Sequence, residues 1–172
     1  WLVRERDKPK AQPTTYEERK LREAERNRAL SKAGRDIGVI PPVEDPHRRE
    51  QCKHSFRSFC EQYFPSAFHL EWSEDHLRVI EKIERAVIDG GLFAFAMPRG
   101  SGKTTLARIA GLWAILYGYR PYVCLIGSAE DQAKSMLDAI KREMLANDQL
   151  LADFPEAIYP SRKLENNARR QI

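Results

Sequence analysis

The sequence predicts a parallel α/β fold in which strands and helices alternate. Residues 92–97 form a short, continuous apolar run between Gly91 and Pro98, as expected for a strand buried on both faces. Apolar residues at helical spacing follow, and residues 122–126 predict a second buried strand. A further helix is expected over residues 128–147. Strand, helix, strand and helix in this order are typical of a parallel sheet covered by helices.

Length and composition are those of an ordinary globular chain. The 172 residues are 42% hydrophobic and 31% charged, which is enough apolar material for one domain core. The longest apolar stretch is interrupted by Arg108, so a membrane span is excluded. The first residues contain neither an initiator Met nor an apolar signal region, and we expect this chain to be a piece of a longer protein.

The three cysteines predict neither a disulfide framework nor a zinc site. Cys52, Cys60 and Cys124 are few and scattered, which favours a reducing compartment. No pair has the two-to-four-residue spacing of a structural zinc site, and Cys52 and Cys60 fall on one face of a predicted helix.

Residues 1–45 are expected to form a basic helical arm followed by a proline-rich linker. The first 35 residues hold 11 Lys/Arg and 6 Asp/Glu, so the positive net charge of the chain belongs to this segment. Thr15 and Glu18 have capping-box spacing and open a helix that continues to about Ala33. Two interpretations stay open: contact with nucleic acid or an acidic partner, and a solvated charged helix.

Residues 46–172 are expected to form the first part of the α/β domain. Asp45 and Pro46 predict a helix from 46 to about 63, and Ser73 caps a second helix that ends near Asp89. No confident element is predicted beyond Asp153. The apolar positions that define the predicted helices are Phe56, Phe59, Cys60 and Tyr63; Leu77, Ile80, Ile83 and Val87; Leu106, Ile109, Ala110 and Trp113; and Ala133, Met136, Leu137, Ile140 and Met144.

The loop between the first predicted strand and the helix after it has the features of a phosphate loop, or Walker A motif. Glycines let the backbone wrap around a polyphosphate at the positive end of a helix. Lys103 would contact the β- and γ-phosphates of ATP, and the Thr104 hydroxyl would bind Mg²⁺. The candidate phosphate-binding residues are Pro98, Arg99, Gly100, Ser101, Gly102, Lys103, Thr104 and Thr105. The predicted fold is therefore the three-layer parallel sheet of a P-loop NTPase (RecA-like, ASCE), incomplete in this chain and preceded by the helical arm.

One position departs from the regular motif. The pattern G-x-x-x-x-G-K-[ST] requires Gly where this chain has Met97, and Arg99 stands inside the loop. Arg99 has two interpretations: it stabilises charge on the γ-phosphate as a catalytic residue beside Lys103, or it pairs with a carboxylate elsewhere.

Residues 95–105, Phe-Ala-Met-Pro-Arg-Gly-Ser-Gly-Lys-Thr-Thr, resemble the ATPase of the large terminase subunit of tailed bacteriophages. Three softer matches flank this loop: Tyr63-Phe64-Pro65, Trp72-Ser73, and residues 123–128. The resemblance covers roughly residues 46–160.

The resemblance implies a motor that packages viral double-stranded DNA into procapsids by ATP hydrolysis. It implies a homo-oligomeric ring, a terminase small subunit and a portal protein as partners, no membrane, and the host cell cytoplasm as the location. Members of that family hold adenine with residues ahead of the loop, where this chain has Trp72, Asp75 and His76, although the usual Gln is absent. The alternative role of this stretch is helix capping and core packing.

Hydrolysis also requires an Asp that holds magnesium and a Glu that orients water. The resemblance places this Walker B motif, and the nuclease carboxylates, beyond Ile172. We therefore expect this chain to bind ATP but to hydrolyse it hardly at all. Two alternatives remain: another P-loop NTPase, such as a helicase or small-molecule kinase, and a non-catalytic module that binds nucleotide or DNA.

Overall fold

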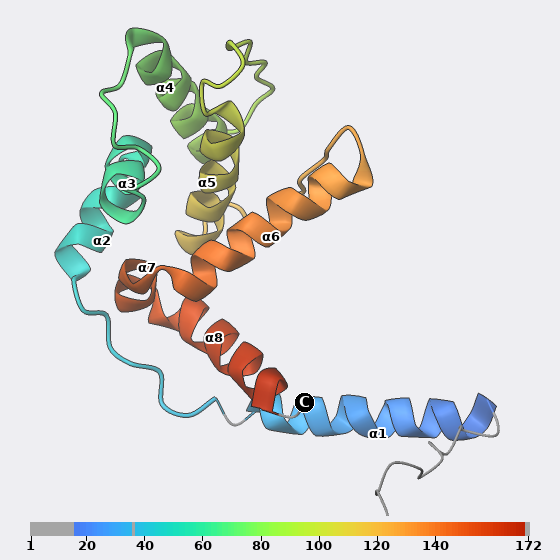
Figure 1. The fold of residues 1–172 in the computed structure, drawn as a ribbon. Helices are drawn as coiled ribbons and strands as arrows, with labels where there is room; N and C mark the ends of the chain where they lie inside the picture. Colours follow the sequence, from blue (N-terminus) through green and yellow to red (C-terminus); the bar gives the residue numbers. More distant parts are fainter. Residues whose placement is uncertain (1–15, 36, 171–172) are drawn as a thin grey trace, which may run out of the picture.

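The computed structural model describes residues 16–35 and 37–170, and over these ranges its regular elements are helices (Figure 1). They are α1 (Tyr16–Arg35), α2 (Pro46–Lys53), α3 (Phe56–Tyr63), α4 (Glu74–Ile88), α5 (Lys103–Leu116), α6 (Glu130–Ala146), α7 (Asp148–Asp153) and α8 (Pro155–Arg170). Helices α3, α4 and α5 pack against one another, α6 contacts α5 and α8, and α1 contacts α8.

The predicted three-layer parallel sheet is wrong, because no residue in the described ranges lies in a strand. Residues 92–97 belong to the connection between α4 and α5, and residues 122–126 to the connection between α5 and α6. Leu92 and Ile126 are 102% and 87% exposed, whereas buried strands were expected. Each run has the apolar pattern of a strand, but a strand also needs a hydrogen-bonded neighbour, and neither run is paired in this part of the chain. The fold is therefore helical and is not that of a RecA-like domain.

The predicted helix over residues 46–63 is two helices. Asp45 caps α2, as expected, and Pro46 lies in its first turn. The chain then turns at His54, and the Ser55 hydroxyl accepts a hydrogen bond from the Ser58 N–H at 3.1 Å, which starts α3 anew. The predicted apolar face of this segment is confirmed, since its four members are buried: Phe56, Phe59, Cys60 and Tyr63.

The helix predicted after Ser73 agrees more closely with the structure. Ser73 caps α4, which ends at Ile88, one residue before the predicted end. The spacing of Ser128 and Asp131 predicts a capping box at the start of α6, and this prediction is wrong. The side-chain oxygen Oε1 of Gln132 accepts from the Ser128 N–H and hydroxyl, both at 2.8 Å. Helices α7 and α8 were not predicted, and the Thr15 cap expected for α1 lies outside the described residues.

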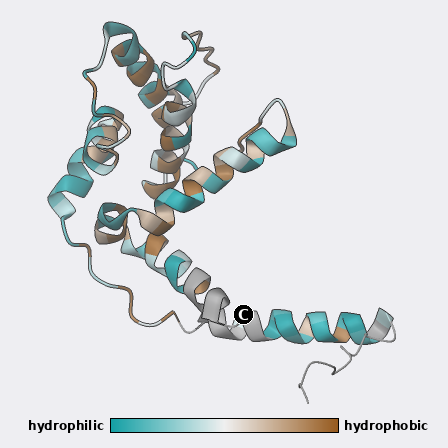
Figure 2. Ribbon diagram, viewed as in Figure 1, coloured by the Kyte–Doolittle hydropathy of each residue, from teal (hydrophilic) through white to brown (hydrophobic). Residues whose placement is uncertain are grey.

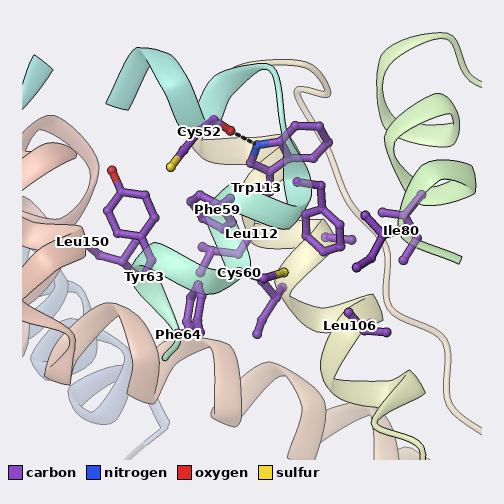
Figure 3. Close-up of a cluster of buried hydrophobic side chains, with 14 of the residues drawn as sticks. Cys52, Phe59, Cys60, Tyr63, Phe64, Ile80, Leu106, Leu112, Trp113 and Leu150 are labelled. Carbon is purple, nitrogen blue, oxygen red and sulfur yellow. Dashed lines mark hydrogen bonds between the residues drawn. The ribbon is translucent and has the colours of Figure 1, made fainter. Parts of the chain in front are cut away.

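The core is built around α3 and α5 (Figure 3). Helix α5 buries the side chains of Leu106, Ile109 and Trp113, as its spacing predicts. The Trp113 indole N–H donates to the Cys52 carbonyl oxygen at 3.0 Å, so the largest side chain of the core also satisfies its polar atom. This packing fixes the position of α5 and of the loop that precedes it.

Helix α1 is exposed at every side chain that the structure describes. Figure 2 shows hydrophilic residues along most of its visible length, and Tyr16 and Leu21 are exposed. None of the helices in the described ranges is long and apolar enough to cross a membrane.

Candidate phosphate-binding site

The loop before α5 turns at two glycines. Gly100 and Gly102 have φ of 86° and 74°, a left-handed conformation that residues with a side chain rarely adopt. The Ser101 N–H donates to the Pro98 carbonyl oxygen at 3.4 Å and closes the turn. Backbone that alternates between left-handed glycines and a residue of negative φ turns successive N–H groups toward one side, where they form a concave anion site.

Helix α5 begins directly on this loop. Its N-cap is Gly102, which has no side chain to cap the first turn, and the first hydrogen bond of the helix runs from the Leu106 N–H to the Gly102 carbonyl oxygen at 2.9 Å. The N–H groups of Lys103, Thr104 and Thr105 therefore have no partner inside the helix. Together with the helix dipole they favour an anion at this end.

The Lys103 side chain folds back over the loop. Its ammonium donates to the carbonyl oxygens of Met97 and Pro98, at 3.4 and 3.2 Å. Both acceptors are neutral and the side chain is exposed, so a phosphate oxygen would compete well for this cation. The positive charge is thus already held at the mouth of the loop.

Arg99 and Thr104 are exposed beside Lys103. Arg99 forms no ion pair with any carboxylate in the ranges that the structure describes. The interpretation of Arg99 as a partner in a structural ion pair therefore has no support among the described residues.

A cleft of about 400 Å³ lies between this loop and the segment that leads into α4. Six of the ten predicted nucleotide-binding residues line it: Trp72, His76, Gly100, Ser101, Gly102 and Thr105. Pro98, Arg99, Lys103 and Thr104 are not part of this lining. Residues named from the sequence therefore form much of the lining of this cleft, in a fold different from the one predicted.

Trp72 forms part of the opposite wall and is fixed by two contacts. Its indole N–H donates to Glu61 Oε1 at 2.8 Å, and its ring packs on Phe68 with 5.0 Å between ring centroids. Burial raises the pKa of Glu61, but hydrogen bonds from Arg57 and Trp72 outweigh it, and the pKa is lowered overall. The charged form of Glu61 therefore holds the ring in place.

His76 connects α4 to the loop. Its Nε2 lies 3.0 Å from the Ser101 carbonyl oxygen, and its Nδ1 lies 2.7 Å from the hydroxyl of Ser73, the N-cap of α4. A carbonyl oxygen only accepts, so Nε2 carries the proton and donates it. Asp75, in the same turn, pairs instead with Arg78 at 3.6 Å and faces solvent.

Two polar side-chain atoms at the cleft are buried without a partner: Ser101 Oγ and Arg108 Nε. An unsatisfied buried polar atom is unfavourable unless a ligand or water completes it. Arg108 and Phe68 are cleft residues that sequence reasoning missed. The signal for Arg108 was present, because it is the one charged residue between Leu106 and Leu116, in an otherwise apolar helix.

The cysteines and acidic residues offer no alternative metal centre. No group of three or more His, Cys, Asp or Glu side chains gathers in the described part of the chain. Cys52 and Cys60 are buried in the core, and burial raises the pKa of Cys52 to about 11. A protonated thiol is a poor metal ligand, so both residues act as core side chains.

Comparison with models of known protein families, with curated protein sequences and with solved structures gives no match.

Proposed function

We propose that this chain is the ATP-binding portion of a phage terminase large subunit, which powers DNA packaging into procapsids by ATP hydrolysis. The proposed ATP site is the loop before α5, and the fold around it is helical. Its support is the sequence Phe-Ala-Met-Pro-Arg-Gly-Ser-Gly-Lys-Thr-Thr over residues 95–105, together with the geometry of that loop.

The observation that carries the nucleotide-binding part is the junction of the loop with α5. Left-handed glycines at 100 and 102 precede a helix whose first N–H groups have no side-chain cap, and the Lys103 ammonium lies over the same loop. A phosphate chain needs backbone N–H donors, a helix N-terminus and a cation at one place. The unpartnered Ser101 hydroxyl adds a donor beside them.

In this proposal each loop residue binds a different part of the magnesium-bound nucleotide. Lys103 binds the β- and γ-phosphates, and Arg99 stabilises charge on the γ-phosphate. Thr104 supplies one oxygen to Mg²⁺, which takes its other ligands from phosphate and water. Trp72 and Phe68 offer apolar ring faces, and the size of the cleft suits a nucleotide base.

The wider role depends on the resemblance alone. Double-stranded DNA, the terminase small subunit, the portal protein, a homo-oligomeric ring and the host cytoplasm are proposed on that basis. The seven Lys/Arg of α1 make its surface a candidate for DNA contact, while its four Glu leave the solvated-helix interpretation open.

Calorimetric titration with magnesium and a non-hydrolysable ATP analogue tests the nucleotide-binding part. We expect saturable binding by the wild-type chain and a loss of at least about tenfold in Lys103→Ala, since a charge-assisted contact to phosphate is removed. Lys82→Ala, which removes an exposed lysine from α4, is the matched control and should bind as the wild type does. A folded wild-type chain that does not bind, or equal binding by Lys103→Ala, would contradict the proposal.

A further inference from the structure

His76 lies at the cleft, but the atom it contacts belongs to the loop backbone. Its Nε2–H donates to the Ser101 carbonyl oxygen at 3.0 Å, and its other ring nitrogen is held by the Ser73 hydroxyl. Since Ser73 also caps α4 by accepting from the His76 N–H at 3.4 Å, the imidazole is fixed at both ends. Hydrogen bonds at both ring nitrogens therefore link the start of α4 to the loop through the imidazole.

This contact fixes the direction of one peptide group. The peptide bonds in the described ranges are trans, so the Ser101 C=O and the Gly102 N–H point in opposite directions. With the carbonyl oxygen turned toward His76, the Gly102 N–H is turned away from α4.

The peptide at this position needs such a restraint. It joins Ser101 to Gly102, which has a left-handed φ and open space around the position of a Cβ. Glycine has few steric barriers to rotation about φ, so the loop alone restrains this peptide weakly. Among the described residues, His76 donates the hydrogen bond that the Ser101 carbonyl accepts.

We propose that His76 is a positioning residue for the phosphate site: by holding the Ser101 carbonyl it fixes the Ser101–Gly102 peptide, and with it the start of α5, whose uncapped N–H groups bind the phosphate chain of the nucleotide. The inference rests on the proposed nucleotide-binding function. It assigns His76 to the phosphate end of the ligand, whereas the resemblance places this stretch at the base. The two assignments predict different responses to a ligand that has no base.

The test compares two probes, magnesium with inorganic tripolyphosphate and magnesium with the non-hydrolysable ATP analogue. His76→Ala is expected to weaken both by about tenfold, the value of one well-placed hydrogen bond. His76→Gln, whose amide N–H reaches the same carbonyl, should recover most of the affinity. His54→Ala removes an exposed histidine at the end of α2 and is the matched control.

The outcomes separate the two proposals. If the folded wild-type chain binds neither probe, the proposed function fails and the inference falls with it. If the wild type binds both probes but His76→Ala weakens only the ATP analogue, His76 contacts the base and the inference is wrong. Equal binding of both probes by wild type and His76→Ala, or no recovery in His76→Gln with its thermal stability intact, would also overturn it.

Discussion

The Arg48 guanidinium holds both carboxylate oxygens of Asp153, with Nε 2.7 Å from Oδ2 and Nη2 2.9 Å from Oδ1. The Tyr63 hydroxyl donates to the same carboxylate, and Asp153 is fully buried. These contacts join α2, α3 and α7, which are far apart in the sequence. Hydrogen bonding to Asp153 raises the pKa of Arg48, while burial and Asp153 together raise that of Tyr63, so both donors keep their protons.

Removing this carboxylate should be among the most destabilising substitutions in the chain. In Asp153→Ala, Arg48 and Tyr63 lose their shared acceptor, and we expect a loss of about 3 kcal/mol in the free energy of unfolding. Denaturant unfolding measures it. Asp148→Ala is the control, because the Asp148 side chain is exposed and its pair with Arg162 should contribute at most about 1 kcal/mol. Similar losses in the two variants would show that the buried network is not a main support of the fold.

The substitution Ser101→Ala should lower the affinity for the ligand without lowering the stability of the fold. The Ser101 hydroxyl is buried without a partner, so its removal should leave thermal stability unchanged within about 0.5 kcal/mol. If the hydroxyl donates to phosphate, affinity for the magnesium-bound ATP analogue should fall by about three- to tenfold. Thermal melting measures the stability, and calorimetric titration measures the affinity. A loss of stability without a change in affinity would assign Ser101 to the fold instead of the site.

At low pH, protonation of Glu61 should weaken the hydrogen bond that the Trp72 indole N–H donates to it. The folded-state pKa of Glu61 lies below its usual 4.5, so the stabilisation that Glu61 contributes is present at neutral pH and is lost as pH falls through that lowered value. The indole N–H resonance of Trp72 should shift in the same pH range. In Glu61→Gln, which keeps an acceptor oxygen but does not titrate, that shift should disappear. A titration that persists in Glu61→Gln would assign the effect to another group.

ATP turnover by this chain is expected to be very slow. Glu71 is the one carboxylate that lines the cleft in the described part of the chain, and it is exposed. Orienting an attacking water requires a carboxylate fixed near the γ-phosphate. We predict binding without steady phosphate release in a coupled phosphate assay. Steady release that Lys103→Ala abolishes would show that the catalytic groups are present after all.

Local signals in the sequence predicted helices and caps well. Asp45 and Ser73 cap the helices they were expected to cap, and the buried faces of α3 and α5 follow their apolar spacing. These features depend on neighbours within one or two turns, which a sequence displays directly. The glycine turn before α5 could be predicted for the same reason, because its glycines and the start of α5 are adjacent in the chain.

The prediction of a sheet failed because strand pairing depends on partners distant in the sequence. Residues 92–97 have a strand pattern, but whether they pair is decided by other segments, and in this structure they lie exposed between helices. The cleft wall formed by Phe68 and the burial of Arg108 Nε depend likewise on how α3, α4 and α5 pack. His76 was identified as a site residue, but its contact with the Ser101 carbonyl was not visible in the sequence.

The proposed function requires that the backbone from Gly102 to Thr104 bind phosphate. Amide NMR resonances of an isotope-labelled sample, followed during titration with magnesium and the non-hydrolysable ATP analogue, test it most directly. We predict saturable shifts that are largest at the N–H groups of Gly102, Lys103 and Thr104 and are greatly reduced in Lys103→Ala. Shifts spread over the basic surface of α1, with these three amides unmoved, would contradict it.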